Sequence, residues 1–287
     1  MGQAMRLYMR SDAGSIPMRA RRRLPSFLDP GQKFPDLAEM PPELAMMVLS
    51  NLNPTELCLA MCVNDFWREM AKDELLWQGL CRATWGWVAA YERKDEPGFS
   101  FMELFMQLDE GTLTFNGDAD VGIEYLTKRG IIEDTPVSIA RFIHTTNRLD
   151  RWQVRNYLAK KHDILEELVS LETYANKFLP NALRGFFSNI QSPGHNTQQL
   201  QTLLDMFAQR FINCNPNCGL TKDGICILCY SLILLSVDLT SPHVKNKMSK
   251  REFIRNVRHA TQEANDELSG HLYDNIYLLG HIAPERW

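Results

Sequence analysis

The sequence predicts an all-α fold. Apolar residues recur at helical spacing along most of the chain, and no stretch of useful length alternates as a half-buried strand does. Residues that cap helix N-termini stand before several of these periodic segments. The 287 residues suffice for roughly two domains, and an apolar content of 45% can bury a sizeable core. We expect a disordered tail over 1–37, a three-helix module over 38–87, a helical connector over 88–114 and a helical array over 115–280.

Composition excludes several function classes. A net charge of −4 gives no overall field that favours nucleic acid, and we expect no nucleic-acid partner. The longest apolar run, residues 225–237, is shorter than the ~20 residues that cross a bilayer. The N-terminus lacks the long apolar core of a secretory signal, so we expect a cytoplasmic protein whose cysteines are reduced.

The tail over 1–37 holds scattered Pro and Gly and few periodic apolar residues, so it cannot offset the entropy of ordering. It carries a basic cluster of Arg19, Arg21, Arg22 and Arg23. Such clusters are most often solvated, while a transient contact with anionic lipid and a nuclear address stay open as alternatives. Gly2 occupies the acceptor position for myristoylation, although Arg6 stands where that motif has Ser or Thr.

The module over 38–87 begins with a helix whose apolar residues share one face: Leu44, Met47, Val48 and Leu52. Asn53 and Pro54 then supply an N-cap and a first helical residue for a second helix. The apolar residues that mark the second and third helices are Leu57, Met61, Val63, Leu75, Leu76, Trp77 and Leu80. The connector holds one more aromatic helix, which reads FSFMELFMQL.

The segment EMPPELAMMVLSNLNPTELCLAMCVNDFWREMAKDELLWQGLC resembles an F-box. The matching residues are Pro41, Pro42, Glu43, Leu44, Leu52 before a Pro-led helix, Leu57, Val63, Trp67, Leu76 and Trp77. The segment departs from the family at Asn64 and Asp65, where a Cys and a basic residue are usual. The resemblance implies a Skp-type adaptor as a partner, which links F-box proteins to the cullin of a cullin–RING ubiquitin ligase.

Three short helices of this size expose more apolar surface than they can hide, and a partner's helices would cover the remainder. The candidate adaptor-binding residues are Pro41, Pro42, Leu44, Val48 and Leu52. Periodicity alone does not distinguish core from interface, so a small bundle that packs only its own core stays open.

Short helices follow one another beyond residue 115. Thr135 and Pro136 begin one of them, and Ser249 with Glu252 forms a capping box at another. Residues 228–258 read LCYSLILLSVDLTSPHVKNKMSKREFIRNVR, in which an apolar run ends in Asp238 and a basic segment leads to a helix beginning near Lys250. This stretch resembles the second signature motif of the Sec-seven domain, the helical catalytic domain of guanine-nucleotide exchange factors for Arf-type small GTPases.

The resemblance extends from about Phe115 to Tyr277. It includes Gly122, Tyr125, Leu126, Gly130, Pro136, Leu149, Asp150, Tyr157, Leu158 and the segments NALRGFF and RFINCNP. In this family a stacked array of helices forms a hydrophobic groove that receives the switch regions of the GTPase. By motif position, the resemblance implies a GTPase-binding groove formed by Cys226, Tyr230, Leu234, Asp238, Ser241, Asn246 and Lys247.

Some features of this motif leave alternatives open. Ser236, Val237 and Thr240 replace the family's usual Asn, Thr and His, so the affinity and the preferred GTPase are open. Leucines at this spacing are more often part of a core than of a binding surface, and both interpretations stay open. The basic run over 245–258 is either a solvated helix face or a patch complementary to an acidic GTPase surface.

Exchange-active family members carry a glutamate at the tip of the loop before the helix that here ends in RFINCNP. That carboxylate repels the β-phosphate of GDP and disrupts the Mg²⁺ site; two like charges about 4 Å apart contribute roughly 4 kcal/mol at an effective dielectric constant of 20. The loop here reads QSPGHNT, which places His195 at that position, and no acid occurs between Glu172 and Asp205. A neutral imidazole does not repel phosphate and a protonated one attracts it. We therefore expect weak or no exchange activity.

Four cysteines in two pairs invite a zinc interpretation: Cys214, Cys218, Cys226 and Cys229. The second pair falls in an apolar helix, where a reduced cysteine behaves as a small hydrophobe, so we expect no metal. No glycine-rich phosphate loop and no hydrolase nucleophile motif occurs, and we expect no cofactor.

The two resemblances together imply a substrate-recognition subunit of an SCF-type ubiquitin ligase that captures an Arf-family small GTPase and regulates Arf signalling. Its GTPase partner would bring this cytoplasmic protein to membranes. The alternative is an active exchange factor that promotes GDP/GTP exchange with another catalytic group.

Overall fold

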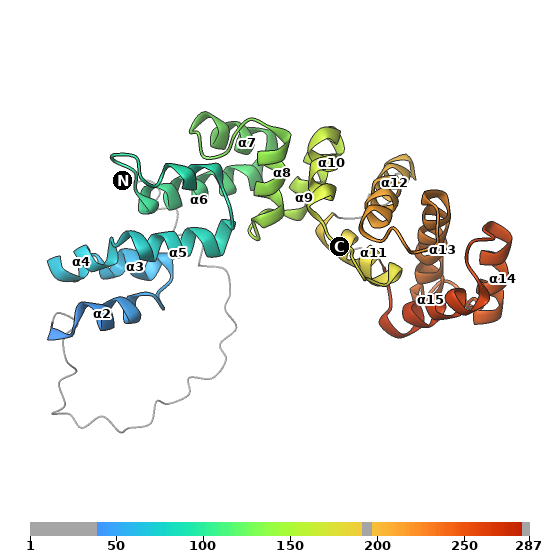
Figure 1. Ribbon diagram of the computed structural model, residues 1–287. Helices are drawn as coiled ribbons and strands as arrows, with labels where there is room; N and C mark the ends of the chain where they lie inside the picture. Colours follow the sequence, from blue (N-terminus) through green and yellow to red (C-terminus); the bar gives the residue numbers. More distant parts are fainter. Residues whose placement is uncertain (1–38, 191–196, 283–287) are drawn as a thin grey trace, which may run out of the picture.

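A computed structural model describes residues 39–190 and 197–282. His195, Gly2 and the arginine cluster of the tail lie outside these residues. Every described element is helical, which confirms the predicted all-α class (Figure 1). The first elements are α2 (Pro42–Leu49), α3 (Pro54–Ala60), α4 (Asp65–Ala71), α5 (Glu74–Trp85), the 3-10 helix η2 (Ala89–Arg93), α6 (Phe101–Gly117) and α7 (Ala119–Lys128). The remaining helices are α8 (Pro136–Thr145), α9 (Arg151–Lys160), α10 (His162–Leu171), α11 (Leu179–Asn189), α12 (Thr197–Cys214), α13 (Lys222–Thr240), α14 (Lys250–Ala260) and α15 (Asp266–Leu279).

The segment 42–85 contains four helices where the sequence predicts three. Asn53 caps α3 as expected, in a capping box with Glu56. That helix ends at Ala60, so Val63 lies beyond it. The side chain of Asn64 accepts a hydrogen bond from the Trp67 amide at 2.9 Å and starts the additional helix α4. A residue noted only as a departure from the F-box pattern is thus an N-cap.

The helix α6 runs without interruption across the boundary expected between connector and array at 114–115. Ser100 caps its start, and Asp118 serves both as its C-cap and as the N-cap of α7. The helix α6 thus belongs to both the connector and the array. The domain limits given above stay a prediction.

The helices form an elongated stack. Figure 1 shows α2–α5 at one end, α13–α15 at the other and α8–α10 between them. The expected helix starts at Thr135 and Ser249 are confirmed: Thr135 accepts from the Ser138 amide at 3.2 Å, and Ser249 and Glu252 form the capping box. Buried apolar residues form one continuous cluster along this stack, from Leu49 of α2 near one end to Phe253 and Val257 of α14 near the other.

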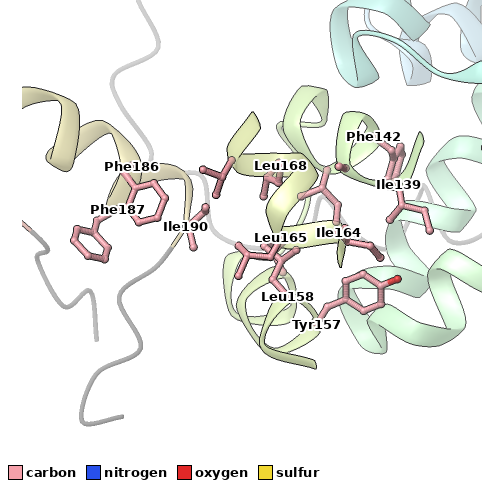
Figure 2. Packing of buried hydrophobic residues seen from close by; sticks show 14 of the residues in the cluster. Ile139, Phe142, Tyr157, Leu158, Ile164, Leu165, Leu168, Phe186, Phe187 and Ile190 are labelled. Carbon is pink, nitrogen blue, oxygen red and sulfur yellow. The ribbon is translucent and has the colours of Figure 1, made fainter. Parts of the chain in front are cut away.

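The middle of the core is built from four helices. Figure 2 shows side chains of α8, α9 and α10 meeting one another, with residues from α11 and its C-cap beside them. The labelled residues are Ile139, Phe142, Tyr157, Leu158, Ile164, Leu165, Leu168, Phe186, Phe187 and Ile190. Each is no more than 6% exposed, so the centre of the stack is a packed core.

The helix α13 is the one helix in the described part of the chain that is long and apolar enough to cross a membrane. It packs against α11, α12, α14 and α15. The residues on its buried face include Ile225, Leu228, Cys229, Leu232 and Leu235. These contacts give α13 the place of the central helix of the C-terminal array.

Candidate functional site

An exposed apolar face on α2 is the first candidate binding surface. Leu44 is 48%, Met47 65% and Val48 47% exposed, whereas Ala45 and Leu49 on the opposite face are buried. Residues three and four apart share one side of a helix, so these three exposed side chains form a stripe. Large apolar side chains gathered in this way mark a surface that another molecule covers.

The structure divides the predicted adaptor-binding residues into two groups. Pro41 and Pro42 are exposed at the start of α2, beside Leu44 and Val48. Leu52 is half-buried and packs against the core. The chain turns after α2 ends at Leu49, which carries Leu52 away from the helical face that its spacing suggested.

Other exposed apolar side chains of this segment are absent from the predicted set. They are Met47, Leu59, Val63 and Leu75. The signal for Met47 was present, because it lies on the same periodic face as Leu44 and Val48. Leu59, Val63 and Leu75 carry no such signal, since their exposure depends on how α3, α4 and α5 pack.

The outer face of α13 is the second candidate surface. Leu234 is 66% and Val237 45% exposed, and Cys226 and Tyr230 are half-buried. Cys226, Tyr230 and Leu234 follow one another at intervals of four residues, so they lie along one side of the helix. Leu232 and Leu235 point into the core instead. The apolar run therefore supplies some residues to the core and others to an exposed surface.

At its N-terminal half, this face of α13 borders α12. The thiol of Cys226 donates to the Asp205 carboxylate at 3.3 Å and lies near the Leu204 carbonyl. Burial first, and then the hydrogen bond to Asp205, raises the pKa of Cys226 to about 12. Cys226 is thus a neutral thiol on the side of α13 that borders α12, and it has no nucleophilic character. Asp205 stood out in the sequence only as the end of the acid-free span.

The C-terminal end of α13 is closed by the polar residues predicted for the groove. The Asp238 carboxylate accepts from the Met248 amide at 2.7 Å, and the Lys247 ammonium donates to the Asp238 carbonyl at 2.6 Å and to the Ser241 carbonyl. The Tyr273 hydroxyl donates to the Met248 carbonyl at 2.9 Å. The two bonds from Lys247 satisfy carbonyls that the end of α13 leaves without partners. Asp238, Ser241 and Lys247 thus shape the loop over 241–249, and Asn246 is exposed on it.

Two acids pair with part of the basic run over 245–258. Lys250 contacts Asp274 at 2.6 Å, and Arg258 pairs with Asp266. These pairs join α14 to α15. They favour a structural role for that part of the run.

The cysteine pairs do not assemble a metal site in the described ranges 39–190 and 197–282, where no group of three or more His, Cys, Asp or Glu could hold an ion. Cys229 is fully buried, and burial raises the pKa of its thiol well above the usual value. Cys218 lies beside the Leu220 carbonyl, with 3.8 Å between sulfur and oxygen. The zinc interpretation finds no support in this geometry.

Comparison with known families decides the classification of this architecture. A model of the Sec7 domain matches residues 105–278, and an F-box-like model matches residues 37–83. The chain belongs to the Sec7 domain family. Both resemblances read from the sequence, the F-box and the Sec-seven domain, are confirmed by these matches.

Curated relatives match the chain over different lengths. F-box only protein 8 from Homo sapiens is 53% identical over 254 residues, which is 87% of this chain and 79% of that protein. The same protein from Bos taurus matches equally well. The brefeldin A-inhibited guanine nucleotide-exchange protein 1 of Homo sapiens is 35% identical over 154 residues, which is 52% of this chain and 8% of that protein.

Solved structures agree with the fold of the array. The Sec7p catalytic domain aligns with a TM-score of 0.54 at 31% identity and covers 59% of this chain and 93% of its own. A Sec7 domain bound to ARF1-GDP and complexed with brefeldin A aligns with a TM-score of 0.54 at 25% identity and covers 59% of this chain and 89% of its own. The second candidate surface, on α12, α13 and the loop over 241–249, lies within the residues that the Sec7 model matches.

Proposed function

We propose that the protein is a substrate-recognition subunit of an SCF-type ubiquitin ligase that captures an Arf-family GTPase in its Sec7 groove. The observation that carries this proposal is the presence of two separate apolar faces on one chain. The stripe on α2 belongs to the F-box-like segment, and the stripe on α13 belongs to the Sec7 domain. A protein with two such faces can hold two partners at the same time.

The adaptor arm of the proposal is tested by charge substitution on α2. The double variant Leu44→Asp/Val48→Asp should lose capture of a Skp-type adaptor and of cullin and keep capture of ARF1. Both side chains are about half exposed, so the substitutions should leave the fold intact. Leu113→Asp on α6, at a side chain 49% exposed, is the matched control. Equal adaptor capture by all three proteins would contradict the assignment of α2.

The GTPase arm is tested on α13. Leu234→Asp/Val237→Asp places two charges on the groove and should abolish ARF1 capture while adaptor binding persists. Burying an unpaired charge in an interface opposes association, which is why a loss is expected. ARF1 is the appropriate probe because a related Sec7 domain has been captured with it. Unchanged ARF1 binding by this variant would exclude the α13 face as the groove.

Exchange activity is proposed to be weak or absent, because His195 stands where the family's catalytic glutamate is expected. Release of fluorescent GDP from ARF1 measures it. We expect slow release with the wild type and faster release with His195→Glu, which restores a carboxylate that repels the β-phosphate. Robust exchange that His195→Ala lowers would instead favour the second candidate, an active exchange factor with an unusual catalytic group.

The proposed location is the cytoplasmic side of membranes that carry the GTPase, with the arginines of the tail adding a transient contact. Removing the charge of Arg19, Arg21, Arg22 and Arg23 should then lower sedimentation with anionic vesicles and leave ARF1 capture unchanged. Equal sedimentation of both proteins would remove the tail from the proposal.

A further inference from the structure

The connection between the F-box helices and the Sec7 helices is part of the fold. Residues 86–100 separate α5 from α6, yet Val88 and Tyr91 within them are buried. The Ala90 amide donates to the Ile131 carbonyl at 3.1 Å, which ties the connection to the segment after α7. Residues 92–98 form its exposed part. A free tether between two independent domains would have neither burial nor such a bond.

Trp85 fastens the end of α5 to the Sec7 helices. It is fully buried, its indole N–H donates to the Thr112 hydroxyl of α6 at 2.8 Å, and its ring meets the edge of Phe105 at 4.9 Å between centroids. Its carbonyl accepts from the Thr145 hydroxyl of α8 at 2.7 Å. The next residue is Gly86, with φ of 61°, where an added Cβ would lie 2.6 Å from the Thr145 Cβ. The backbone at this corner thus requires glycine.

The start of α5 is fastened to α6 as well. The Glu74 carboxylate accepts from the Phe101 amide at 2.6 Å and from the Ser100 hydroxyl at 3.1 Å, at the N-terminus of α6. Between the two ends, Trp77 meets Phe105 at 5.4 Å between centroids, and its indole N–H donates to the Ala71 carbonyl of α4 at 2.8 Å. The helices α4, α5 and α6 therefore pack as a single unit.

A second set of contacts links α10 to α11 and α12, and so towards α13. Glu172, the C-cap of α10, accepts through its carbonyl from Arg210 of α12 at 2.8 Å, and its carboxylate accepts from Asn189 of α11. The Asn215 side chain after α12 donates to the Tyr174 carbonyl at 3.0 Å. The helix α12 in turn packs along α13. These hydrogen bonds, together with the packing of α10 against α12 and of α12 against α13, link the middle of the stack to α13 within the described residues.

We infer that α5, α6 and α10 hold the adaptor-facing helix α2 and the groove helix α13 in one fixed relation, so that a captured GTPase is offered to the ligase in one orientation. Only the lysines on one face of that GTPase would then receive ubiquitin. The inference rests on the proposed function for its consequence, while the fixed relation itself is a property of this chain. Glu74 and Trp85 act as positioning residues.

Distances between spin labels test the fixed relation in the full chain. Labels at the exposed Glu69 of α4 and Arg251 of α14, introduced as unnatural amino acids, should give one narrow distance distribution. The clamp variant, Glu74→Ala/Trp85→Phe, removes the hydrogen bonds of the Glu74 carboxylate to Ser100 and Phe101 and the indole bond of Trp85 to Thr112, and should broaden the distribution. The control Glu103→Ala/Trp152→Phe changes exposed residues of the same types and should not broaden it. A broad distance distribution in the unsubstituted chain would overturn the inference. So would a clamp variant that folds and keeps the narrow distribution of the wild type.

An insertion provides a decisive variant that does not weaken the packing. A short Gly-Ser segment between Pro97 and Gly98 lengthens the exposed part of the connection and leaves the contacts of Glu74 and Trp85 in place. The distribution should stay narrow, because packing and not the length of the connection holds the two ends. Broadening by the insertion alone would mean that the connection is a tether, and would overturn the inference.

The single orientation of the captured GTPase is tested with a reconstituted ligase. The measurement is which lysines of ARF1-GDP receive ubiquitin. The wild type should modify fewer different lysines than the clamp variant at equal ARF1 capture. The same set of lysines with both proteins would contradict the single orientation. Absence of ARF1 capture would refute the proposed function, while the spin-label distances would still decide whether the relation is fixed.

Discussion

At the scale of single residues, an acid in the loop after α14 binds the N-cap residue of α13. Glu263 follows α14 and accepts hydrogen bonds from the Thr221 amide at 2.7 Å and the Thr221 hydroxyl at 2.6 Å, at the N-cap of α13. Gly224 leaves the room for this carboxylate, since a Cβ there would overlap it. The hydrogen bonds from Thr221 lower the pKa of Glu263, because they favour its ionised form.

This pKa shift gives a pH-dependent prediction for Glu263→Gln. A carboxyl whose pKa is lower in the folded state contributes stability fully above its unfolded pKa of about 4.3, and loses it as the pH falls through the folded value. The variant should therefore melt below the wild type near neutral pH, and the gap should close as the solution becomes more acidic than about pH 4. Thermal unfolding followed by circular dichroism measures this gap. Glu166→Gln, at an exposed acid on α10, is the control, and a gap that is independent of pH would contradict the role of Glu263.

At the scale of elements, two glycines set the close approach of α6 and α7. A Cβ on Gly122 of α7 would overlap the backbone of Phe115, and one on Gly111 of α6 would overlap Leu126. Overlap with backbone cannot be relieved by turning a side chain, so the two helices would have to separate. Gly185, exposed on α11, has no atom within 4 Å of an added Cβ.

The same substitution should therefore have opposite effects at two helical positions. Gly122→Ala should lower the free energy of unfolding by about 1–3 kcal/mol, through overpacking. Gly185→Ala should raise it by about 0.5–1 kcal/mol, because alanine loses less backbone entropy in a helix. Urea titrations of both variants measure the difference. Equal effects would mean that α6 and α7 are not in the close contact described here.

The sequence was most informative where the deciding chemistry is local. Asn53, Thr135 and Ser249 start helices as predicted, because an N-cap needs only the residues that follow it. The helix that Asn64 starts was not predicted, because Asn64 was considered only as a departure from the F-box pattern and not as an N-cap. The burial of Leu52 depends on how distant segments pack, which spacing does not encode. His195 was read from sequence and stays a prediction, because it lies outside the described residues.

At the scale of the whole molecule, one continuous core joins α2, which carries the proposed adaptor-binding face, to α13, which carries the proposed groove. The cluster of buried residues extends from Leu49 in α2 to Phe253 and Val257 in α14. Figure 1 shows α2 and α14 at opposite ends of the stack. A ligand that binds only the folded state stabilises every part that unfolds together with its site. Adaptor binding should therefore stabilise α13, although the adaptor is not expected to touch it.

Hydrogen exchange in the presence of a Skp-type adaptor measures this coupling. At an adaptor concentration about one hundred times the Kd, global unfolding becomes more costly by about 2.7 kcal/mol, so the slowest amides should exchange about a hundredfold more slowly. The slow amides of α13 should share this protection with those of α5 if the chain unfolds as one unit. Leu44→Asp/Val48→Asp, which should not bind the adaptor, supplies the baseline. Protection restricted to α2–α5 would mean that the F-box unfolds separately, because ligand binding cannot stabilise a part that stays folded when its site opens.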